Sequence, residues 1–167
     1  MAGSPSSFAL PDRKGPRPRT DNAVPHLQKT QRSPEHLRKA LINWAVAMLP
    51  DVTEEDTRIS VSATRALWLS EAVPAAHDDA FMPPAGSREF AHVHADGSTH
   101  ICVSDEAENE IVRRGWGEPH PLKDKGVNEV LFYAPRDSEE LEIARYAIAE
   151  AWSYATGNEN PVQPTQR

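Results

Sequence analysis

The chain has 167 residues and a formal net charge of −7, and 38% of its residues are hydrophobic. This length is sufficient for one domain with a well-buried core. No run of 18 apolar residues occurs, and the N-terminus lacks the apolar stretch of a signal peptide. We therefore expect a cytoplasmic protein that does not enter a membrane.

The N-terminal residues 1–33 are rich in Ser and Pro, carry six Lys or Arg against two Asp, and show no apolar periodicity. This composition predicts a disordered basic tail. Subtracting its charge of +4 leaves −11 on the remainder, which argues against a nucleic-acid-binding surface on the folded part. We expect a single domain over residues 34–157, followed by a flexible C-terminus over residues 158–167.

The first predicted elements follow this tail. Apolar residues at helical spacing predict a helix over residues 34–49, and an acidic turn follows at 51–56. Polar and apolar residues alternate over 58–62, and an apolar run covers 66–69, so both segments are predicted strands. Residues 73–87 contain three Pro and one Gly and are predicted to form a long surface loop.

A β-hairpin is predicted around Asp96-Gly97, with strands over 89–95 and 98–104. A two-residue turn would place His100 opposite Val93, whereas a three-residue loop with a glycine bulge would place it opposite His92. The second register sorts the side chains more cleanly between the two faces. In that register, one face carries Ala91, Val93, Ile101 and Val103, and the other carries His92, His94, His100 and Cys102.

Three more elements complete the predicted fold. Ser104 begins a short helix that ends at Gly115, residues 127–133 form a buried strand, and a helix covers 138–156 before Gly157. The pattern lacks regular β-α-β alternation, so we predict the α+β class. The expected architecture is an antiparallel sheet of four to five strands with helices packed on one face.

The histidines on the other face are the main chemical signal. Same-face neighbours on a strand lie about 6.6 Å apart and cross-strand pairs about 5 Å apart, so His92, His94 and His100 can converge on one point. They could ligate zinc, iron or copper, although no established metal-binding spacing occurs. Alternatively, a neutral imidazole can accept a substrate proton, or the residues are simply solvated side chains of the hairpin.

Three other residues allow more than one interpretation. Trp116 lies between two glycines and forms part of the core or the wall of a cleft. Arg136 binds a substrate oxygen or pairs with Glu139 or Glu140. The single cysteine, Cys102, cannot form an internal disulfide, which fits a reducing compartment, and we interpret it as a small hydrophobic residue.

Some enzyme classes lack any sequence support. No Gly-x-Ser-x-Gly elbow, phosphate-binding glycine loop or dinucleotide fingerprint occurs. Serine hydrolases, nucleotide hydrolases and nucleotide cofactors are therefore disfavoured.

Four sequence blocks resemble the fungal luciferase family, and the resemblance covers residues 57–157. The blocks are Arg88-Glu89-Phe90-Ala91-His92-Val93-His94, Ser98-Thr99-His100, Gly115-Trp116-Gly117-Glu118-Pro119-His120-Pro121-Leu122 and Leu131-Phe132-Tyr133-Ala134-Pro135-Arg136. This family oxidises 3-hydroxyhispidin, a hydroxylated pyranone, with O2 through a peroxide that loses CO2. The resemblance implies a pocket for a small enolic substrate, O2 as co-substrate and no cofactor. The hydrophobic N-terminal segment of the fungal enzymes has no counterpart here, so membrane attachment is not implied.

The resemblance also implies roles for individual residues. The implied catalytic residues, which deprotonate or orient the substrate, are His92, His94, His100 and His120. The implied substrate-binding residues are Arg136, Tyr133 and Trp116.

The leading hypothesis is thus a luciferase-like, cofactor-independent oxygenase that acts on a small enolic or pyranone-type compound. Two alternatives stay open. One is a non-catalytic domain that binds a small ligand or another molecule, and the other is a metalloenzyme whose ligands are His92, His94 and His100. The sequence does not indicate an oligomeric state.

Overall fold

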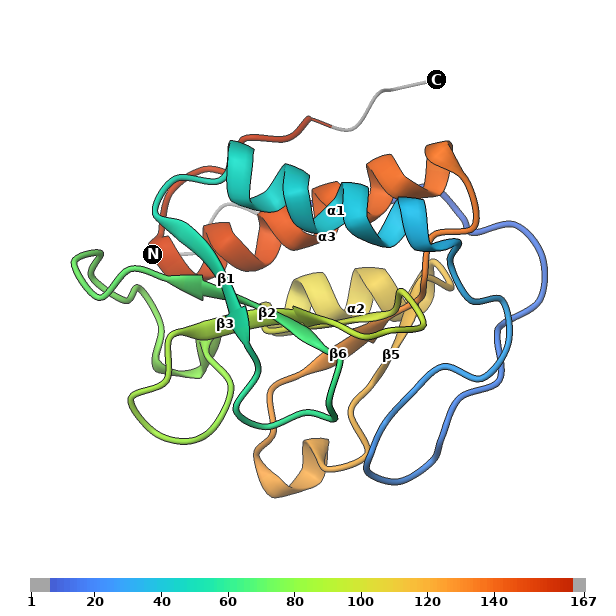
Figure 1. Cartoon of the computed structure of the whole chain (residues 1–167), viewed down its shortest axis with the longest axis horizontal. Coiled ribbons are helices and arrows are strands. Elements are labelled where there is room, and N and C mark those ends of the chain that lie inside the picture. The colour runs from blue at the N-terminus through green and yellow to red at the C-terminus, as the bar shows by residue number, and fades with distance from the viewer. Residues whose placement is uncertain (1–6, 164–167) are drawn as a thin grey trace.

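The computed structural model describes residues 7–163 as three helices and a six-stranded sheet (Figure 1). The helices are α1 (Glu35–Met48), α2 (Asp105–Arg113) and α3 (Ser138–Thr156). The strands are β1 (Val52–Asp56), β2 (Arg65–Leu69), β3 (Glu89–Val93), β4 (Thr99–Ile101), β5 (Gly117–Pro119) and β6 (Val130–Phe132). The order in the sheet is β1-β2-β3-β4-β6-β5, with every neighbouring pair antiparallel.

One face of the sheet packs against the helices. Ala91, Val93 and Ile101 are fully buried and belong to the same apolar cluster as residues from all three helices. In Figure 1, α1 and α3 lie side by side above the strands. The predicted α+β architecture with helices on one face is confirmed. The sheet has six strands, however, rather than the four or five that were predicted.

The predicted register of the hairpin is also confirmed. His92 lies opposite His100, and Ala91 lies opposite Ile101. The turn brings the Gly97 amide to the His94 carbonyl at 3.0 Å, and Gly97 has a φ of +93° that favours glycine. This register places the two histidines on the face of the sheet that the helices leave uncovered.

The first strand was predicted in the wrong place. The alternating residues 58–62 lie in an irregular segment, and the acidic residues 52–56, predicted as a turn, form the edge strand β1. An edge strand exposes most of its side chains, so acidic residues are tolerated there. Arg65 of β2 forms ion pairs with Glu54 and Asp56, which offsets their charge.

The sixth strand, β5, was missed because it contains Gly117 and Pro119, residues that are depleted from strands. Gly117 is required by close packing, since a Cβ atom there would lie 2.4 Å from the Leu131 carbonyl oxygen. The predicted strand over 127–133 is present, but β6 comprises only Val130–Phe132. β5 holds Glu118, and Glu129 directly precedes β6, and both residues belong to the site described below.

The three predicted helices are present; α3 has the predicted bounds, and the ends of α1 and α2 are shifted by one or two residues. Ser104 caps α2 by accepting a hydrogen bond from the Ala107 amide at 3.2 Å. Asp137 caps α3 through the Glu140 amide, and Gly157 ends it with a φ of +76°. The loop predicted over 73–87 is confirmed and contains one short 3-10 turn.

The prediction of a disordered tail over residues 1–33 is wrong for residues 7–33. Phe8 and Leu10 are buried in the core, and the Phe8 ring lies 4.7 Å from the ring of Tyr146 in α3. This segment makes long-range contacts without regular structure of its own, so it has no periodicity that the sequence could show. The predicted tail over residues 1–6 lies outside the described residues.

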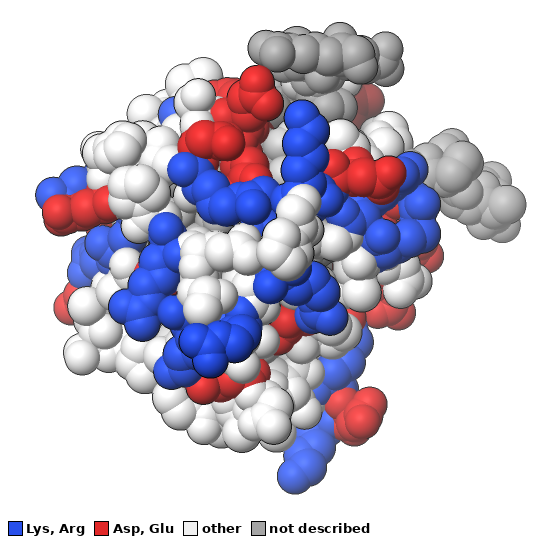
Figure 2. Space-filling view, turned by 90° about the vertical axis from the view of Figure 1, so that its right-hand side faces the viewer, with Lys and Arg blue, Asp and Glu red and all other residues white. Residues whose placement is uncertain are grey.

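The same N-terminal segment continues across the uncovered face of the sheet, where His26 and Gln28 are buried. Figure 2 views the molecule from the side on which this segment lies, and many Lys and Arg side chains gather there.

The C-terminal residues after α3 were predicted to be flexible. Within them, Asn160 donates a hydrogen bond to Glu150 of α3. Residues 164–167 lie outside the described residues. No helix within residues 7–163 is both long and apolar enough to cross a bilayer.

We predict that Phe8→Ala lowers the free energy of unfolding by about 3 kcal/mol, because it removes a buried aromatic ring from the core. Val24→Ala in the same segment is the control, since Val24 is 56% exposed, and it should change stability by less than about 0.5 kcal/mol. Urea unfolding measures both. A Phe8→Ala effect as small as that of the control would show that this segment does not support the core.

Candidate functional site

Five histidines form a buried cluster on the face of the sheet opposite the helices. They are His26, His92, His94, His100 and His120. Each is at most 8% exposed, and neighbouring rings lie 4.8–5.6 Å apart between centroids. The structure thus brings together all four histidines that were predicted as catalytic, and adds His26 from the N-terminal segment.

Three of these imidazoles form a row between two carboxyl groups. His92 Nδ1 lies 2.9 Å from Glu89 Oε1, and His92 Nε2 lies 3.0 Å from His100 Nδ1. His100 Nε2 lies 3.1 Å from His26 Nδ1, and His26 Nε2 lies 2.8 Å from Glu118 Oε1. Every nitrogen in the row therefore contacts a hydrogen-bonding partner.

The carboxyl groups at the ends of the row are held by further donors. Glu89 is fully buried and accepts hydrogen bonds from the Thr57 hydroxyl at 2.8 Å and from the Arg58 amide. Burial alone would raise the pKa of Glu118, but hydrogen bonds from His26 and from the hydroxyls of Thr20 and Tyr133 lower it to about 2. Glu118 is therefore a carboxylate at neutral pH.

The remaining two histidines have defined hydrogen-bond partners. His94 Nδ1 contacts Ser98 Oγ at 2.9 Å, and Ser98 Oγ donates to Asp96 Oδ1 at 2.5 Å. His120 Nδ1 accepts from the Leu122 amide at 3.0 Å, so its proton lies on Nε2. Burial and the neighbouring histidines lower the pKa of His120 to about 4.

Burial also lowers the pKa values of His94 and His100, and neighbouring histidines lower them further. Both rings are therefore neutral at pH 7. In two sets of three imidazoles, one nitrogen of each ring lies within 4.8 Å of one nitrogen of each other ring in the set. The first set is His92, His94 and His100, and the second is His26, His100 and His120.

The structure places the three predicted substrate-binding residues outside the cluster. Tyr133 is the nearest of them, because its hydroxyl donates to Glu118 at 2.8 Å, and burial raises its pKa to about 12. Trp116 stacks on Phe132 within the core on the helix side, so it does not face the cluster. Arg136 forms an ion pair with Glu140. This pairing was the second of the two interpretations of Arg136 in the sequence analysis.

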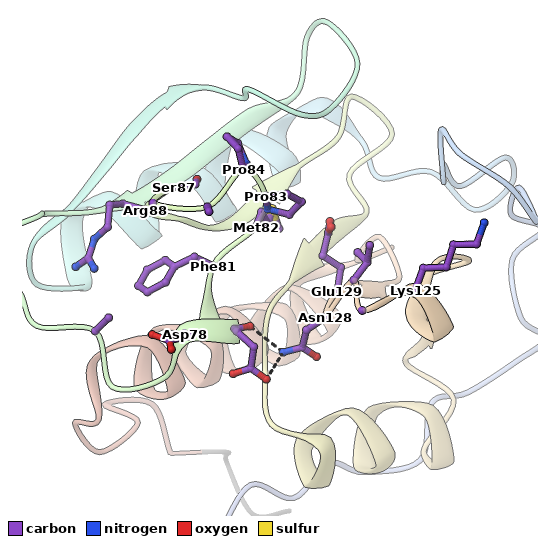
Figure 3. A pocket seen from close by; sticks show the side chains of 16 residues that line it. Asp78, Phe81, Met82, Pro83, Pro84, Ser87, Arg88, Lys125, Asn128 and Glu129 are labelled. Carbon is purple, nitrogen blue, oxygen red and sulfur yellow. Dashed lines mark hydrogen bonds between the residues drawn. The ribbon is translucent and has the colours of Figure 1, made fainter.

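An open pocket of about 700 Å³ lies beside the cluster (Figure 3). The long loop supplies Phe81, Met82 and Arg88, and the segment before β6 supplies Asn128 and Glu129. The Arg88 guanidinium lies over the Phe81 ring at 4.6 Å. A pocket of this size accommodates a small aromatic molecule.

Glu129 connects the pocket to the histidines. Its side chain lines the pocket in Figure 3, and Oε1 lies 3.9 Å from His100 Nδ1. Burial and the charge of Glu89 raise the pKa of Glu129 to about 7. None of the five clustered histidines is among the described residues that line this pocket.

Sequence reasoning missed four residues of this site: His26, Glu89, Glu118 and Glu129. His26 lies in a segment without periodicity and offered no signal. Glu89 and Glu118 lie inside the sequence blocks that resemble the fungal luciferases, so those blocks could have indicated them. Glu129 directly precedes the short apolar strand β6, where a buried carboxylate is not expected.

The fold and site define a small α+β domain with a buried imidazole cluster beside an open pocket. Residues 87–151 match the family described as Luciferase domain. Over 89% of its length, the chain is 31% identical to Luciferase from Armillaria mellea and 30% identical to Luciferase from Armillaria gallica. Luciferase from Neonothopanus nambi is 26% identical over the same share of the chain.

The family match and these relatives show that the chain is similar to fungal luciferases, as its sequence motifs indicated. The chain spans 62% of the length of each of these relatives. No solved structure matches the chain significantly. The matched region contains His92, His94, His100 and His120, whereas His26 lies outside it.

We predict that Glu118→Gln makes stability less sensitive to acid. The pKa of Glu118 is about 2 in the folded chain, below its ordinary value of 4.5. Its stabilising effect is therefore present above about pH 4.5 and is lost as the pH falls toward 2, a change of about 3 kcal/mol in the wild type.

Urea unfolding at several pH values between 5 and 2 measures this dependence. The variant should have a shallower decline than the wild type, and the exposed edge-strand variant Glu55→Gln should decline as the wild type does. Parallel profiles for Glu118→Gln and the wild type would contradict the assigned role of Glu118.

Proposed function

We propose that this chain is a small-molecule oxygenase that binds an enolic or pyranone-type compound in the pocket beside the histidine cluster. The observation that carries the proposal is the position of Glu129, which lies between the pocket and His100. A carboxyl group whose pKa is raised to about 7 suits the removal of a proton from an acidic enol. The luciferase-like family supports oxidation as the type of reaction.

The pocket offers complementary surfaces for such a compound. Phe81 and Met82 provide an apolar wall for a flat ring, and Asn128 and Lys125 border the polar side. Asn128 is held in place by hydrogen bonds to Asp79 and to the Val103 carbonyl. A planar enol can therefore lie against the apolar wall with its hydroxyl toward Glu129.

The proposed reaction needs O2 and no organic cofactor. Glu129 removes the enol proton, and the resulting enolate carbon forms a bond with one oxygen atom of O2. The carbon is oxidised by two electrons, and O2 is reduced to the peroxide level. The proton on Glu129 then passes to the outer peroxide oxygen, so that substrate and O2 give a hydroperoxide with all atoms retained.

In this proposal the predicted catalytic histidines act from behind Glu129. His100 is the imidazole nearest to its carboxyl group, and His92 and His94 pack against His100. Their burial keeps water away from Glu129 and preserves its raised pKa. We assign no substrate contact to Trp116 or Arg136.

A non-catalytic ligand-binding domain is the second candidate function. The burial of all five clustered histidines favours it, because none of them can touch a compound in the pocket without a rearrangement. The two candidates differ in one result. A ligand-binding domain would bind enolic compounds, as measured by calorimetry, but would consume no O2.

Oxygen uptake with 3-hydroxyhispidin and simpler hydroxypyranones tests the proposal. We predict turnover by the wild type and a loss of at least about 100-fold in kcat for Glu129→Gln, which keeps the shape of the side chain but not its basicity. Asp124→Asn is the control, since Asp124 is exposed nearby and does not line the pocket. No uptake with any compound, or unchanged kcat in Glu129→Gln, would refute the proposed reaction.

A further inference from the structure

With one proton on each of its three imidazoles, the buried row has one proton fewer than its hydrogen-bonding contacts need. Four hydrogen-bonding contacts join five groups, which are Glu89, His92, His100, His26 and Glu118. Each contact needs one proton, and carboxylates supply none. Three neutral imidazoles carry one proton each, so one of the four contacts has two lone pairs that face each other. Such a contact is unfavourable in a buried site unless a cation occupies it.

The surrounding donors and acceptors locate this contact. Glu89 accepts from His92 Nδ1, so His92 Nε2 carries a lone pair. Ser98 Oγ gives its own proton to Asp96 and must accept from His94 Nδ1, so His94 Nε2 also carries a lone pair. If His100 donates from Nε2 to His26, its Nδ1 lone pair points to His92 Nε2 at 3.0 Å.

We propose that this chain binds one divalent first-row transition-metal ion through His92 Nε2, His94 Nε2 and His100 Nδ1. In each of these three rings, one nitrogen lies within 4.8 Å of one nitrogen of each of the other two rings. Tetrahedral coordination with bonds of about 2.0–2.1 Å requires separations of about 3.3 Å, close to the 3.0 Å between His92 Nε2 and His100 Nδ1. Imidazole ligands suit zinc, iron, copper and nickel.

The outer contacts have the pattern of a metal site. A histidine that ligates a metal usually donates its other N–H group to a carboxylate, carbonyl or similar acceptor, which fixes the ring. His92 donates to Glu89, His94 to Ser98, and His100 to His26, which in turn donates to Glu118. With the ion bound, one proton on each ring supplies all of these hydrogen bonds.

The second set of imidazoles does not fit a metal as well. In that set, His120 would have to ligate through Nε2, because the Leu122 amide donates to Nδ1. A neutral His120 then has its proton on Nε2 and no lone pair for a metal there.

The ion would lie on the pocket side of the cluster, next to Glu129, whose Oε1 is 3.9 Å from His100 Nδ1. The carboxylates of Glu89 and Glu118 would balance its charge. Binding of the ion does not depend on the proposed oxygenase reaction.

The test is metal content, measured without substrate on protein purified without a polyhistidine tag. The protein is treated with a chelator, loaded with Zn²⁺ and passed through a desalting column. We expect about one equivalent of Zn²⁺ in the wild type and less than about 0.1 equivalent in His94→Ala. Two histidine variants outside the proposed ligand set, His120→Ala and His77→Ala, should retain about one equivalent.

Less than 0.1 equivalent in the wild type would overturn the proposal, as would equal retention in His94→Ala. Loss in His120→Ala with retention in His94→Ala would assign the ion to the other set of imidazoles. X-ray absorption of the Zn²⁺-loaded wild type gives a result that needs no variant to fold, with three imidazole nitrogens expected at about 2.0–2.1 Å. Fewer than three would refute the ligand set. Because no turnover is measured, failure here is distinct from failure of the oxygenase assay.

Discussion

The arrangement of the site depends on the pairing of His92 with His100 across the hairpin. This register directs the aliphatic residues of β3 and β4 toward the helices and the imidazoles toward the opposite face. Buried polar groups are costly unless each has a partner, so the histidines need the carboxyl groups of Glu89 and Glu118 at either end of the row. A shift of one residue would send the imidazoles into the apolar core. The hairpin therefore fixes the fold and the chemistry of the site together.

The N-terminal segment completes the site from outside the luciferase-like region. It supplies His26, which links His100 to Glu118, and Gln28, whose side-chain oxygen accepts a hydrogen bond from the Ala134 amide at 2.9 Å. These contacts cover a sheet face that would otherwise expose imidazoles to water. Exposed imidazoles would have ordinary pKa values and would become protonated in mild acid, which would break the row. The segment thus contributes to the burial that keeps His94 and His100 neutral, as well as to the stability of the core.

Much of this arrangement could be predicted from local sequence patterns, and the remainder depends on contacts between distant residues. Periodicity indicated the three helices, and the dipeptide Asp96-Gly97 with its flanking residues indicated the hairpin and its register. The edge strand and β5 were missed because solvent exposure and close packing, respectively, allow residues that are uncommon in strands. His26 and Glu129 could not be assigned to the site, because only the tertiary structure brings them to His100. Trp116 and Arg136 lie inside the blocks that resemble the fungal luciferases, yet they contact Phe132 and Glu140, so a place in such a block does not by itself indicate a substrate contact.

The central claim is that fixed hydrogen-bond partners direct imidazole lone pairs from His92 and His94 to one point beside the pocket. Nitrogen-15 NMR of the histidine side chains in metal-free protein tests this most directly, because it distinguishes a protonated Nδ1 from a protonated Nε2 in each ring. The structure predicts a proton on Nδ1 of His92 and of His94, and a proton on Nε2 of His120. A proton on Nε2 of either His92 or His94 would contradict the account, because that ring would then present a donor to the common point rather than a lone pair.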